Sequence, residues 1–389
     1  MVSKCISSAW LAILAVVALL GHDVEVTAFH TNSRSNLISQ SFKAPSLLAP
    51  RASCKKHDKV FSLLAMKAAG AKAATAAEKK YRGYKGWKTE VQTSRFFLLD
   101  WVRRAYRRFI ICLTGLIFIF LLRVLNKTKV HNYKTLEKLM LERDEGVGLF
   151  TYSNHHSMLD DPGLPALFMP WHSMPWRKMR WNLCNTDMYF VHPVLTHIFR
   201  LGKGMPVSRF EGPEQRYMRD FTEKLNNKDW CHIFAEGKIV QPWRFERDEP
   251  HLGEFRIGPA KVLTHQDKAP ICLPMYHIGM HNVYPERQLK PKKGQKKARG
   301  ASTPISAIPR IGNQIDIFVG EPFSVEPWIE RVKALGAQGV TWENDAAYKE
   351  IQEDLTNHLR ERLLEVEAQA RPYLYGGSGK GKKARKGRK

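Results

Sequence analysis

The sequence between residues 126 and 372 alternates between short apolar segments and longer amphipathic segments. The short segments have the length and composition of buried strands, and they are 146–153, 229–234, 269–279 and 314–320. The longer segments carry apolar residues at helical spacing, and they are 133–144, 214–227 and 346–370. Alternation of this kind predicts a single α/β domain in which helices flank a mostly buried sheet.

The composition supports a folded domain and gives it a strong positive charge. The chain has 389 residues, of which 43% are hydrophobic, and this is enough to bury a substantial core. Its net charge of +25 indicates an anionic partner such as a lipid surface or nucleic acid. The basic residues gather in the termini and in the stretch 287–300, without a recognisable nucleic-acid-binding motif. We therefore expect contact with an anionic membrane surface and no nucleic acid.

Both ends of the chain have the composition of non-catalytic segments. Residues 1–28 combine Lys4, an apolar run and a small residue at a plausible cleavage position, as signal peptides do. Residues 29–100 are basic and rich in Ala and Ser, which is typical of a transit peptide or of a disordered linker. Residues 373–389 form a basic, low-complexity tail. The first two segments predict delivery to an organelle membrane, plastid or mitochondrial.

Residues 101–125 are predicted to attach the protein to that membrane. The uncharged centre of this stretch, 109–122, is shorter than the roughly 20 residues that a spanning helix needs. The arginines that flank the centre are suited to lipid phosphates, and they are Arg103, Arg104, Arg107, Arg108 and Arg123. We expect a monotopic, interfacial helix, with a buried core helix as the alternative.

The stretch SNHHSMLDDP, residues 153–162, places two histidines and two aspartates directly after the predicted strand 146–153. The possible pairs are His155 with Asp160 and His156 with Asp161. Because five residues of an ideal helix leave such partners about 140° apart, a pair forms only if the histidine precedes the helix and the aspartate lies at its start. Asp161 before a proline predicts that Asp161 is the helix N-cap.

A histidine held by a carboxylate can act as a general base on a hydroxyl group. No Gly-x-Ser-x-Gly signature accompanies the pair, which predicts direct transfer without a covalent enzyme intermediate. The alternative is a metal site made from the same four residues. Adjacent side chains diverge, and the six scattered cysteines and the other histidines complete no ligand set, so we expect no metal, no cofactor and reduced thiols.

The stretch resembles the Asn-His-x-x-x-x-Asp block of the glycerolipid acyltransferases. Counterparts of three further blocks of that family follow in order, and they are LGKGMPVSR (201–209), IFAEGK (233–238) and ICLPMYHIGM (271–280). Within the superfamily the chain most resembles the tafazzin family of phospholipid–lysophospholipid transacylases, which remodel cardiolipin. The resemblance covers about residues 130–370 and implies a glycerolipid-acyltransferase-like α/β domain with a mixed sheet over 126–372.

The resemblance also implies roles for single residues. It makes His155 the catalytic base and Asp160 the carboxylate that orients it. The family's blocks bind the phosphate and glycerol of the acyl acceptor, and this nominates Asn154, Gly204, Arg209, Glu236 and Gly237 as substrate-binding residues. Two positions depart from the family pattern: Ala235 stands where proline is usual, and His156 is an uncommon neighbour of the base.

Two reactions fit these motifs. In a tafazzin-like reaction, His155 activates the hydroxyl of a lysophospholipid, and the acyl group comes from another phospholipid. In the alternative, an acyl-CoA-dependent lysophosphatidate or lysophospholipid acyltransferase uses the same base. Phospholipid and lysophospholipid are therefore the expected partners, and the motifs predict no particular oligomeric state.

Overall fold

The structure, a computed structural model, describes most of the chain from residue 97 onward. The described residues are 97–168, 179–190, 193–208, 212, 215–288, 302–306, 308–338 and 346–374. The predicted signal 1–28, nearly all of the segment 29–100 and the tail beyond residue 374 lie outside them. The residues from Ala105 onward belong to one compact unit.

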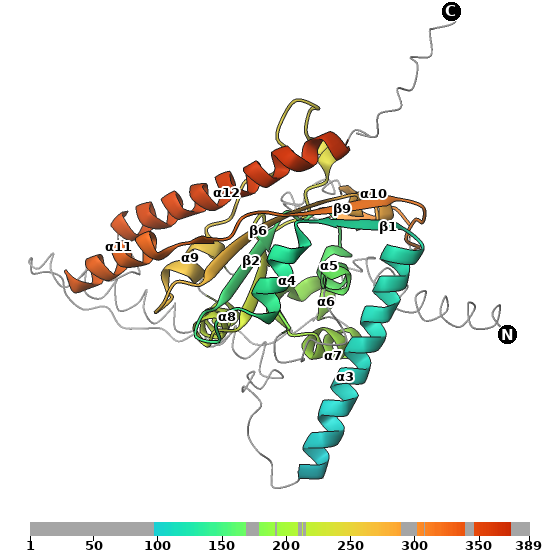
Figure 1. Ribbon diagram of the computed structural model, residues 1–389, viewed down its shortest axis with the longest axis horizontal. Helices are drawn as coiled ribbons and strands as arrows, with labels where there is room; N and C mark the ends of the chain where they lie inside the picture. Colours follow the sequence, from blue (N-terminus) through green and yellow to red (C-terminus); the bar gives the residue numbers. More distant parts are fainter. Residues whose placement is uncertain are drawn as a thin grey trace, which may run out of the picture. The chain divides into compact units, whose positions relative to one another are not determined.

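An eight-stranded sheet forms the centre of this unit (Figure 1). Its strands follow the order β1-β9-β6-β2-β5-β3-β4, and β10 pairs with β6 beside this path. They are β1 (Lys127–His131), β2 (Leu149–Ser153), β3 (Trp181–Asn185), β4 (Gly204–Val207), β5 (Trp230–Phe234), β6 (Ile271–Ile278), β9 (Gln314–Val319) and β10 (Phe323–Ser324). Most neighbours are parallel, whereas β6 pairs antiparallel with β9 and with β10. The predicted mixed α/β sheet is confirmed.

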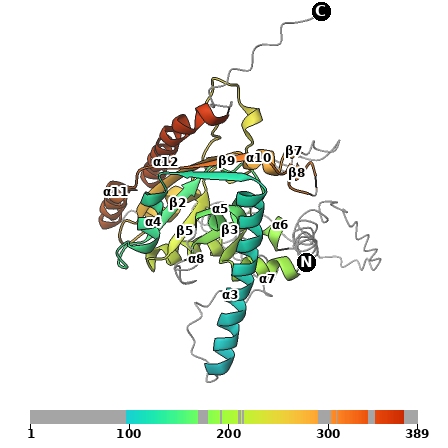
Figure 2. The same cartoon turned by 45° about the vertical axis from the view of Figure 1, so that its right-hand side comes forward.

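Helices cover both faces of the sheet (Figures 1 and 2). One layer consists of α8 (Arg216–Asn226), α9 (Gly258–Thr264), α11 (Glu326–Ala337) and α12 (Ala346–Leu374). The other consists of α3 (Phe97–Ile119), the π-helical turn η1 (Phe120–Val124), α4 (Tyr133–Leu141) and α5 (Asp160–Phe168). Alternate residues of β2 serve the two layers: the Tyr152 hydroxyl donates to the Leu359 carbonyl of α12, whereas Leu149 packs with Leu122 and Met140.

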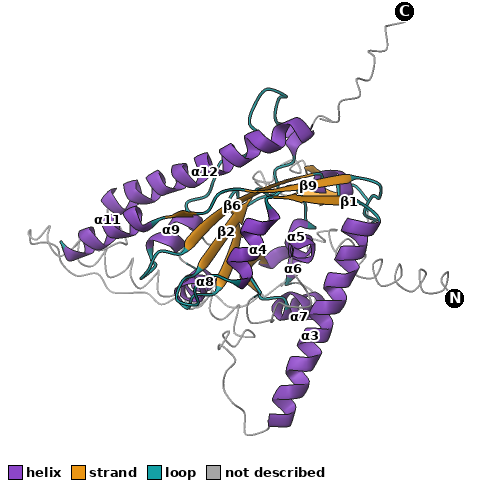
Figure 3. Ribbon diagram, in the orientation of Figure 1, coloured by secondary structure: helices purple, strands orange, loops and turns teal. Residues whose placement is uncertain are grey.

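Short elements join these layers and complete the fold (Figure 3). They are α6 (Thr186–Tyr189), α7 (Pro193–Leu201), the 3-10 turn η3 (Pro242–Arg244), α10 (Met280–Val283) and the hairpin-like pair β7 (Glu286–Gln288) and β8 (Ser302–Pro304). The predicted strands and helices correspond to β2, β5, β6, β9, α4, α8 and α12, and those predictions are confirmed. The sequence did not predict β1, β3 and β4, which are short, and β1 and β3 also contain polar residues.

Helix α3 presents an apolar face to solvent. Among the described helices, Arg104–Val124 is the one stretch long and apolar enough, by length and composition, to cross a membrane, and little of it is buried. The most exposed large side chains of this face within the compact unit are Tyr106, Phe109, Leu113 and Leu116. Arg123, expected at lipid phosphates, instead donates a hydrogen bond to the Leu167 carbonyl and joins the end of this helix to α5.

Candidate active site

The stretch 153–162 forms a turn that leads from β2 into α5. Asp160 is the first residue of α5, and its Oδ2 lies 3.0 Å from the Nδ1 of His155. The histidine thus precedes the helix and the aspartate begins it, as the helical geometry required. The second possible pair does not form, because the His156 ring is fully buried and neither of its nitrogens has a hydrogen-bond partner in the described part of the chain.

Four consecutive main-chain N–H groups of the turn donate to buried carboxylates. Glu236 accepts from His155 at 2.8 Å, and Asp160 accepts from the next two residues at 2.7 and 2.8 Å. Glu286 accepts from Met158 at 2.7 Å. Hydrogen bonds to a charged acceptor are roughly twice as strong as neutral ones. Three carboxylates from different parts of the chain therefore fix the conformation of the turn.

Glu236 belongs to the loop after β5, and each of its two carboxylate oxygens accepts a hydrogen bond. While its Oε2 holds the His155 N–H, its Oε1 accepts the N–H of Gly253 at 2.7 Å. Burial raises the pKa of Glu236 to about 7, although these two N–H groups favour the charged form. Glu236 thus ties the loop after β5 to the main chain of the histidine.

The imidazole of His155 has one nitrogen available for chemistry. Its ring stacks on Phe234 with centroids 4.2 Å apart, and its side chain is 12% exposed. Because Nδ1 donates to Asp160, the neutral ring carries its proton there and leaves the lone pair on Nε2. A base held in one tautomer by a carboxylate can accept a proton from a substrate hydroxyl.

The His155 ring lines a cavity of about 570 Å³ at the carboxyl ends of β3, β4 and β5. Two cationic side chains, Lys238 and Arg256, also line it. Within the described residues neither of them forms an ion pair with a carboxylate, so both are available to an anionic ligand. The remaining wall is largely apolar and includes Ile233, Phe234, Ala235, Ile239 and Ile257.

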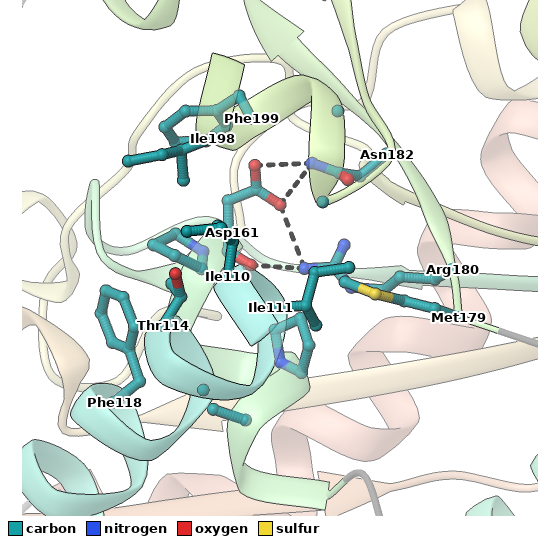
Figure 4. Close-up of a pocket in the computed structure, with 16 residues that line it drawn as sticks. Ile110, Ile111, Thr114, Phe118, Asp161, Met179, Arg180, Asn182, Ile198 and Phe199 are labelled. Carbon is teal, nitrogen blue, oxygen red and sulfur yellow. Dashed lines mark hydrogen bonds and ion pairs between the residues drawn. The ribbon is translucent and has the colours of Figure 1, made fainter. Parts of the chain in front are cut away.

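Asp161 has a different environment from its neighbour Asp160 (Figure 4). Its Oδ1 is 3.0 Å from Nη2 of Arg180, and the Asn182 amide donates to both carboxylate oxygens at 2.6 Å. The Cys184 thiol donates to Oδ2 at 3.0 Å. The predicted N-cap role of Asp161 is therefore wrong: the helix begins one residue earlier, and donors in and next to β3 hold the carboxylate.

A second, apolar pocket of about 100 Å³ lies between α3, α5 and α7 (Figure 4). Its apolar wall includes Ile110, Ile111, Phe118, Pro165, Ala166, Ile198 and Phe199. Asp161 lines both this pocket and the larger cavity, so the two spaces approach each other at α5. The site therefore combines a cavity with cations and a neighbouring pocket with apolar walls.

No group of three or more His, Cys, Asp or Glu side chains in the described ranges is arranged to hold a metal ion. The cysteines in these ranges, at positions 112, 184, 231 and 272, are free.

Comparisons with known proteins agree with this geometry. Residues 122–294 match the Acyltransferase family. An N-acylphosphatidylethanolamine synthase of Arabidopsis thaliana is 31% identical over 217 residues, which cover 56% of this chain and 70% of that protein. The chain belongs to the acyltransferase family.

Two tafazzins are further relatives of this acyltransferase. Tafazzin of Drosophila melanogaster is 29% identical over 226 residues, or 58% of this chain and 53% of the fly protein. Its counterpart in Dictyostelium discoideum is 26% identical over 239 residues, or 59% of this chain and 77% of that protein. The resemblance to the tafazzin family is confirmed, and the protein is an enzyme that transfers acyl groups.

The structure brings most of the predicted site residues of the acyltransferase together, in two different layers. His155 and Gly237 line the large cavity, whereas Asn154, Asp160 and Glu236 lie buried behind the turn. Gly204 begins β4 and lines the apolar pocket, where a Cβ atom would lie 2.9 Å from the Cys184 sulfur. Arg209 lies outside the described residues.

Three charged groups of the site were given no role from the sequence. Lys238 directly follows the Glu-Gly pair, and that position was the one available signal for it. Arg256 and Glu286 lie in no motif, and their roles depend on chain segments that meet only in the folded protein.

Proposed function

We propose that this enzyme is a membrane-associated acyltransferase that transfers a fatty acyl group to the hydroxyl of a lysoglycerophospholipid, with another phospholipid as the donor. The observation that carries the proposal is the His155–Asp160 pair, whose Nδ1–Oδ2 distance is 3.0 Å and which leaves Nε2 for a ligand in the cavity. A base of this kind accelerates proton transfer by about 100-fold to 10,000-fold.

In the proposed reaction, His155 Nε2 takes the proton of the acceptor hydroxyl while the hydroxyl oxygen attacks the ester carbonyl carbon of the donor. The tetrahedral intermediate then collapses, the donor carbon–oxygen ester bond breaks, and the proton on Nε2 passes to the departing glycerol oxygen. One ester is broken and one is formed, so the reaction needs no cofactor. Asp160 stabilises the imidazolium that exists between the two proton transfers.

The cations of the large cavity support a phosphate-bearing substrate. Lys238 and Arg256 line the same cavity as His155, and neither is within ion-pair distance of a carboxylate in the described part of the chain. A guanidinium group can bind two phosphate oxygens at once, and an ammonium group acts as a point charge. We propose that they bind the acceptor phosphate beside Gly237 and that Arg209 contributes to the same task.

Apolar groups near the site support substrates that come from a membrane. The apolar pocket adjoins α3, whose outer face exposes Phe109 by 62%, Leu113 by 43% and Leu116 by 60%. An exposed apolar face of this kind gains stability by entering the acyl layer of a membrane. We propose that α3 attaches the enzyme to the membrane surface from one side and that a substrate acyl chain occupies the pocket.

A second candidate reaction follows from the first relative. The plant protein is named for N-acylation of phosphatidylethanolamine, and 70% of its length matches this chain. The same base at His155 suits an amine acceptor as well as a hydroxyl acceptor, because either one must lose a proton during acyl transfer.

One assay separates these reactions. The purified enzyme is given acyl-radiolabelled phosphatidylcholine as donor together with lysophosphatidylglycerol and phosphatidylethanolamine, first without CoA and then with acyl-CoA. Label in newly formed phosphatidylglycerol without CoA is the expected result. Label in N-acylphosphatidylethanolamine would favour the second candidate. Transfer only from added acyl-CoA would reject the transacylase and support the acyl-CoA-dependent alternative.

The predicted destination is an organelle membrane, plastid or mitochondrial. The composition of residues 1–28 and 29–100 supports this proposal. A fluorescent protein fused behind residues 1–90 is expected to enter an organelle. Fluorescence that stays in the cytosol would contradict the proposal, and the organelle reached decides between plastid and mitochondrion.

A further inference from the structure

His277, a buried residue of β6, contacts both ends of the catalytic turn. Its Nε2 lies 3.0 Å from the carbonyl oxygen of Asn154 and 3.5 Å from Oδ2 of Asp160. The first of these atoms belongs to the peptide group that leads into His155. The second is the oxygen that accepts the His155 Nδ1–H. No sequence motif assigned His277 a role.

The surroundings of His277 fix the position of its proton. Both neighbours of Nε2 are acceptors, and Nδ1 has no hydrogen-bond partner within the described residues. The neutral ring therefore carries its proton on Nε2. Burial lowers the pKa of His277, although Asp160 opposes this, so the ring is neutral near pH 7. The other titratable groups around it are His155, His156, His232 and His281.

The main chain of His277 also holds the turn. The Asn154 side-chain amide donates to the His277 carbonyl at 2.9 Å, and its oxygen accepts the His277 N–H at 2.9 Å. These two bonds continue the pairing of β2 with β6 beyond its last paired residue, Ser153. Asn154 and His277 are thus joined by three hydrogen bonds in a buried environment.

We propose that His277 is a positioning residue for the acyl transfer. Its Nε2–H donates to the Asn154 carbonyl and lies 3.5 Å from Oδ2 of Asp160, so that it fixes the peptide group that leads into His155 and reduces the charge that the carboxylate presents to the imidazole. This inference rests on the proposed role of His155 as the base. It assigns His277 no contact with the substrate.

Two variants test the side chain while leaving the main-chain bonds in place. His277→Leu removes the Nε2–H donor at similar volume, and His277→Gln places an amide N–H near the former Nε2. We expect the leucine variant to lose about 10-fold to 100-fold in kcat, because it removes a buried donor from the Asn154 carbonyl and a polar N–H from beside Asp160, with KM changed by less than about threefold. The glutamine variant is expected to recover most of the loss.

The pH dependence of kcat/KM gives a readout that a purely structural role would not change. Without the donor from His277, Asp160 attracts the imidazolium of His155 more strongly, so the base keeps its proton to a higher pH. The acidic limb of the profile is therefore expected to move to higher pH in His277→Leu and to return in His277→Gln. His281→Leu is a matched control, since His281 is a nearby, partly buried histidine with no hydrogen bond to the turn among the described residues.

The proposal is overturned if His277→Leu keeps the wild-type kcat and acidic limb, or if the glutamine variant is as slow as the leucine variant. These assays use any acyl donor that the wild-type enzyme accepts, so a wrong donor does not affect them. Nitrogen NMR of the histidine rings is a measurement without turnover: the Nε2–H tautomer of His277 is expected even if His155 is not the base. If the wild type shows no Nε2–H signal for His277, the hydrogen bond from Nε2 to the Asn154 carbonyl is rejected.

Discussion

The turn between β2 and α5 buries polar groups, whereas helix α3 exposes apolar ones. In the turn, four successive N–H groups and the His155 imidazole all find carboxylate acceptors inside the protein. On α3, side chains such as Phe109 and Leu116 find no protein partner and remain about 60% exposed. A buried polar group costs free energy unless it is hydrogen-bonded, and an exposed apolar face is unusual unless another apolar surface covers it. The main-chain donors of residues 155–158 are therefore satisfied within the protein, whereas we propose that a membrane covers the exposed face of α3.

The largest effect on the turn is expected from removing either member of the His155–Asp160 pair. His155→Ala and Asp160→Ala are expected to lower kcat by about 100-fold to 10,000-fold, because both remove the oriented base. His156→Leu is the control, since that ring makes no hydrogen bond in the described structure and Leu has a similar volume. If His156→Leu is inactive while His155→Ala keeps its activity, the base is His156 and its assignment to His155 is wrong.

Helix α3 is tested by the triple variant Phe109→Ser, Leu113→Ser and Leu116→Ser. Each side chain contributes about 1.5 to 3 kcal/mol when fully transferred from water. Because the three are only 43% to 62% exposed, roughly half of their sum is lost, and binding to anionic vesicles is expected to weaken by about 100-fold to a few thousand-fold. Vesicle flotation measures this loss. Turnover of substrate dispersed in detergent should remain near wild type, because the exposed face is remote from the chemical step.

A matched control uses apolar residues that are exposed elsewhere. Ile305, Ile308 and Ile311 are 55%, 47% and 57% exposed, and their replacement by serine removes a similar apolar area. If this triple variant weakens vesicle binding as much as the α3 variant does, the contrast between α3 and the rest of the surface fails.

The internal acceptors of the turn are tested by the pH dependence of stability. The Glu236 carboxyl, with a pKa raised by burial from 4.5 to about 7, keeps its proton in the folded state over a range in which the unfolded chain has released it. Its contribution to the free energy of unfolding therefore falls as pH rises from about 4.5 to 7, by about 3 kcal/mol in total. Denaturant unfolding of the wild type and of Glu236→Gln at several pH values measures the difference.

Subtracting the stability of Glu236→Gln from that of the wild type also cancels the contribution of the buried histidines to the pH dependence. Their lowered pKa values act in the opposite direction over part of this range, but both proteins contain them. A difference between wild type and Glu236→Gln that does not change with pH would show that Glu236 is ionised throughout and that burial in the turn costs less than expected.

The smallest effect is expected at Gly204, beside the apolar pocket. A Cβ atom there would lie 2.9 Å from the Cys184 sulfur and 3.0 Å from the Phe199 carbonyl oxygen. Gly204→Ala is therefore expected to destabilise the fold by about 1 to 3 kcal/mol through overpacking, while KM for the acyl acceptor stays unchanged. Thermal unfolding and steady-state kinetics measure the two quantities. A raised KM with unchanged stability would instead favour direct substrate contact.

Several elements of the site were predictable because they depend on neighbours in the sequence. The strand 149–153, the turn and the start of α5 lie within twenty residues, so spacing alone limited the possible pairs to His155–Asp160 and His156–Asp161. The sequence did not predict which of the two pairs forms or that the helix begins at Asp160. Both depend on the other hydrogen-bond partners of the two carboxylates. Arg180, Asn182 and Cys184 draw Asp161 toward β3, and this leaves Asp160 to the histidine.

The sequence by itself determined the α/β class, the acyltransferase blocks and the local geometry that a His–Asp pair must satisfy. Only the tertiary structure decided which carboxylates hold the turn, which cations line the cavity and how His277 meets Asp160. The physical reason is the separation along the chain of the residues that interact. Periodicity and spacing report on interactions within a few residues. Glu236, His277 and Glu286 reach the turn from segments far along the chain, and Arg256 meets His155 only in the wall of the cavity, so these contacts exist only in the folded domain.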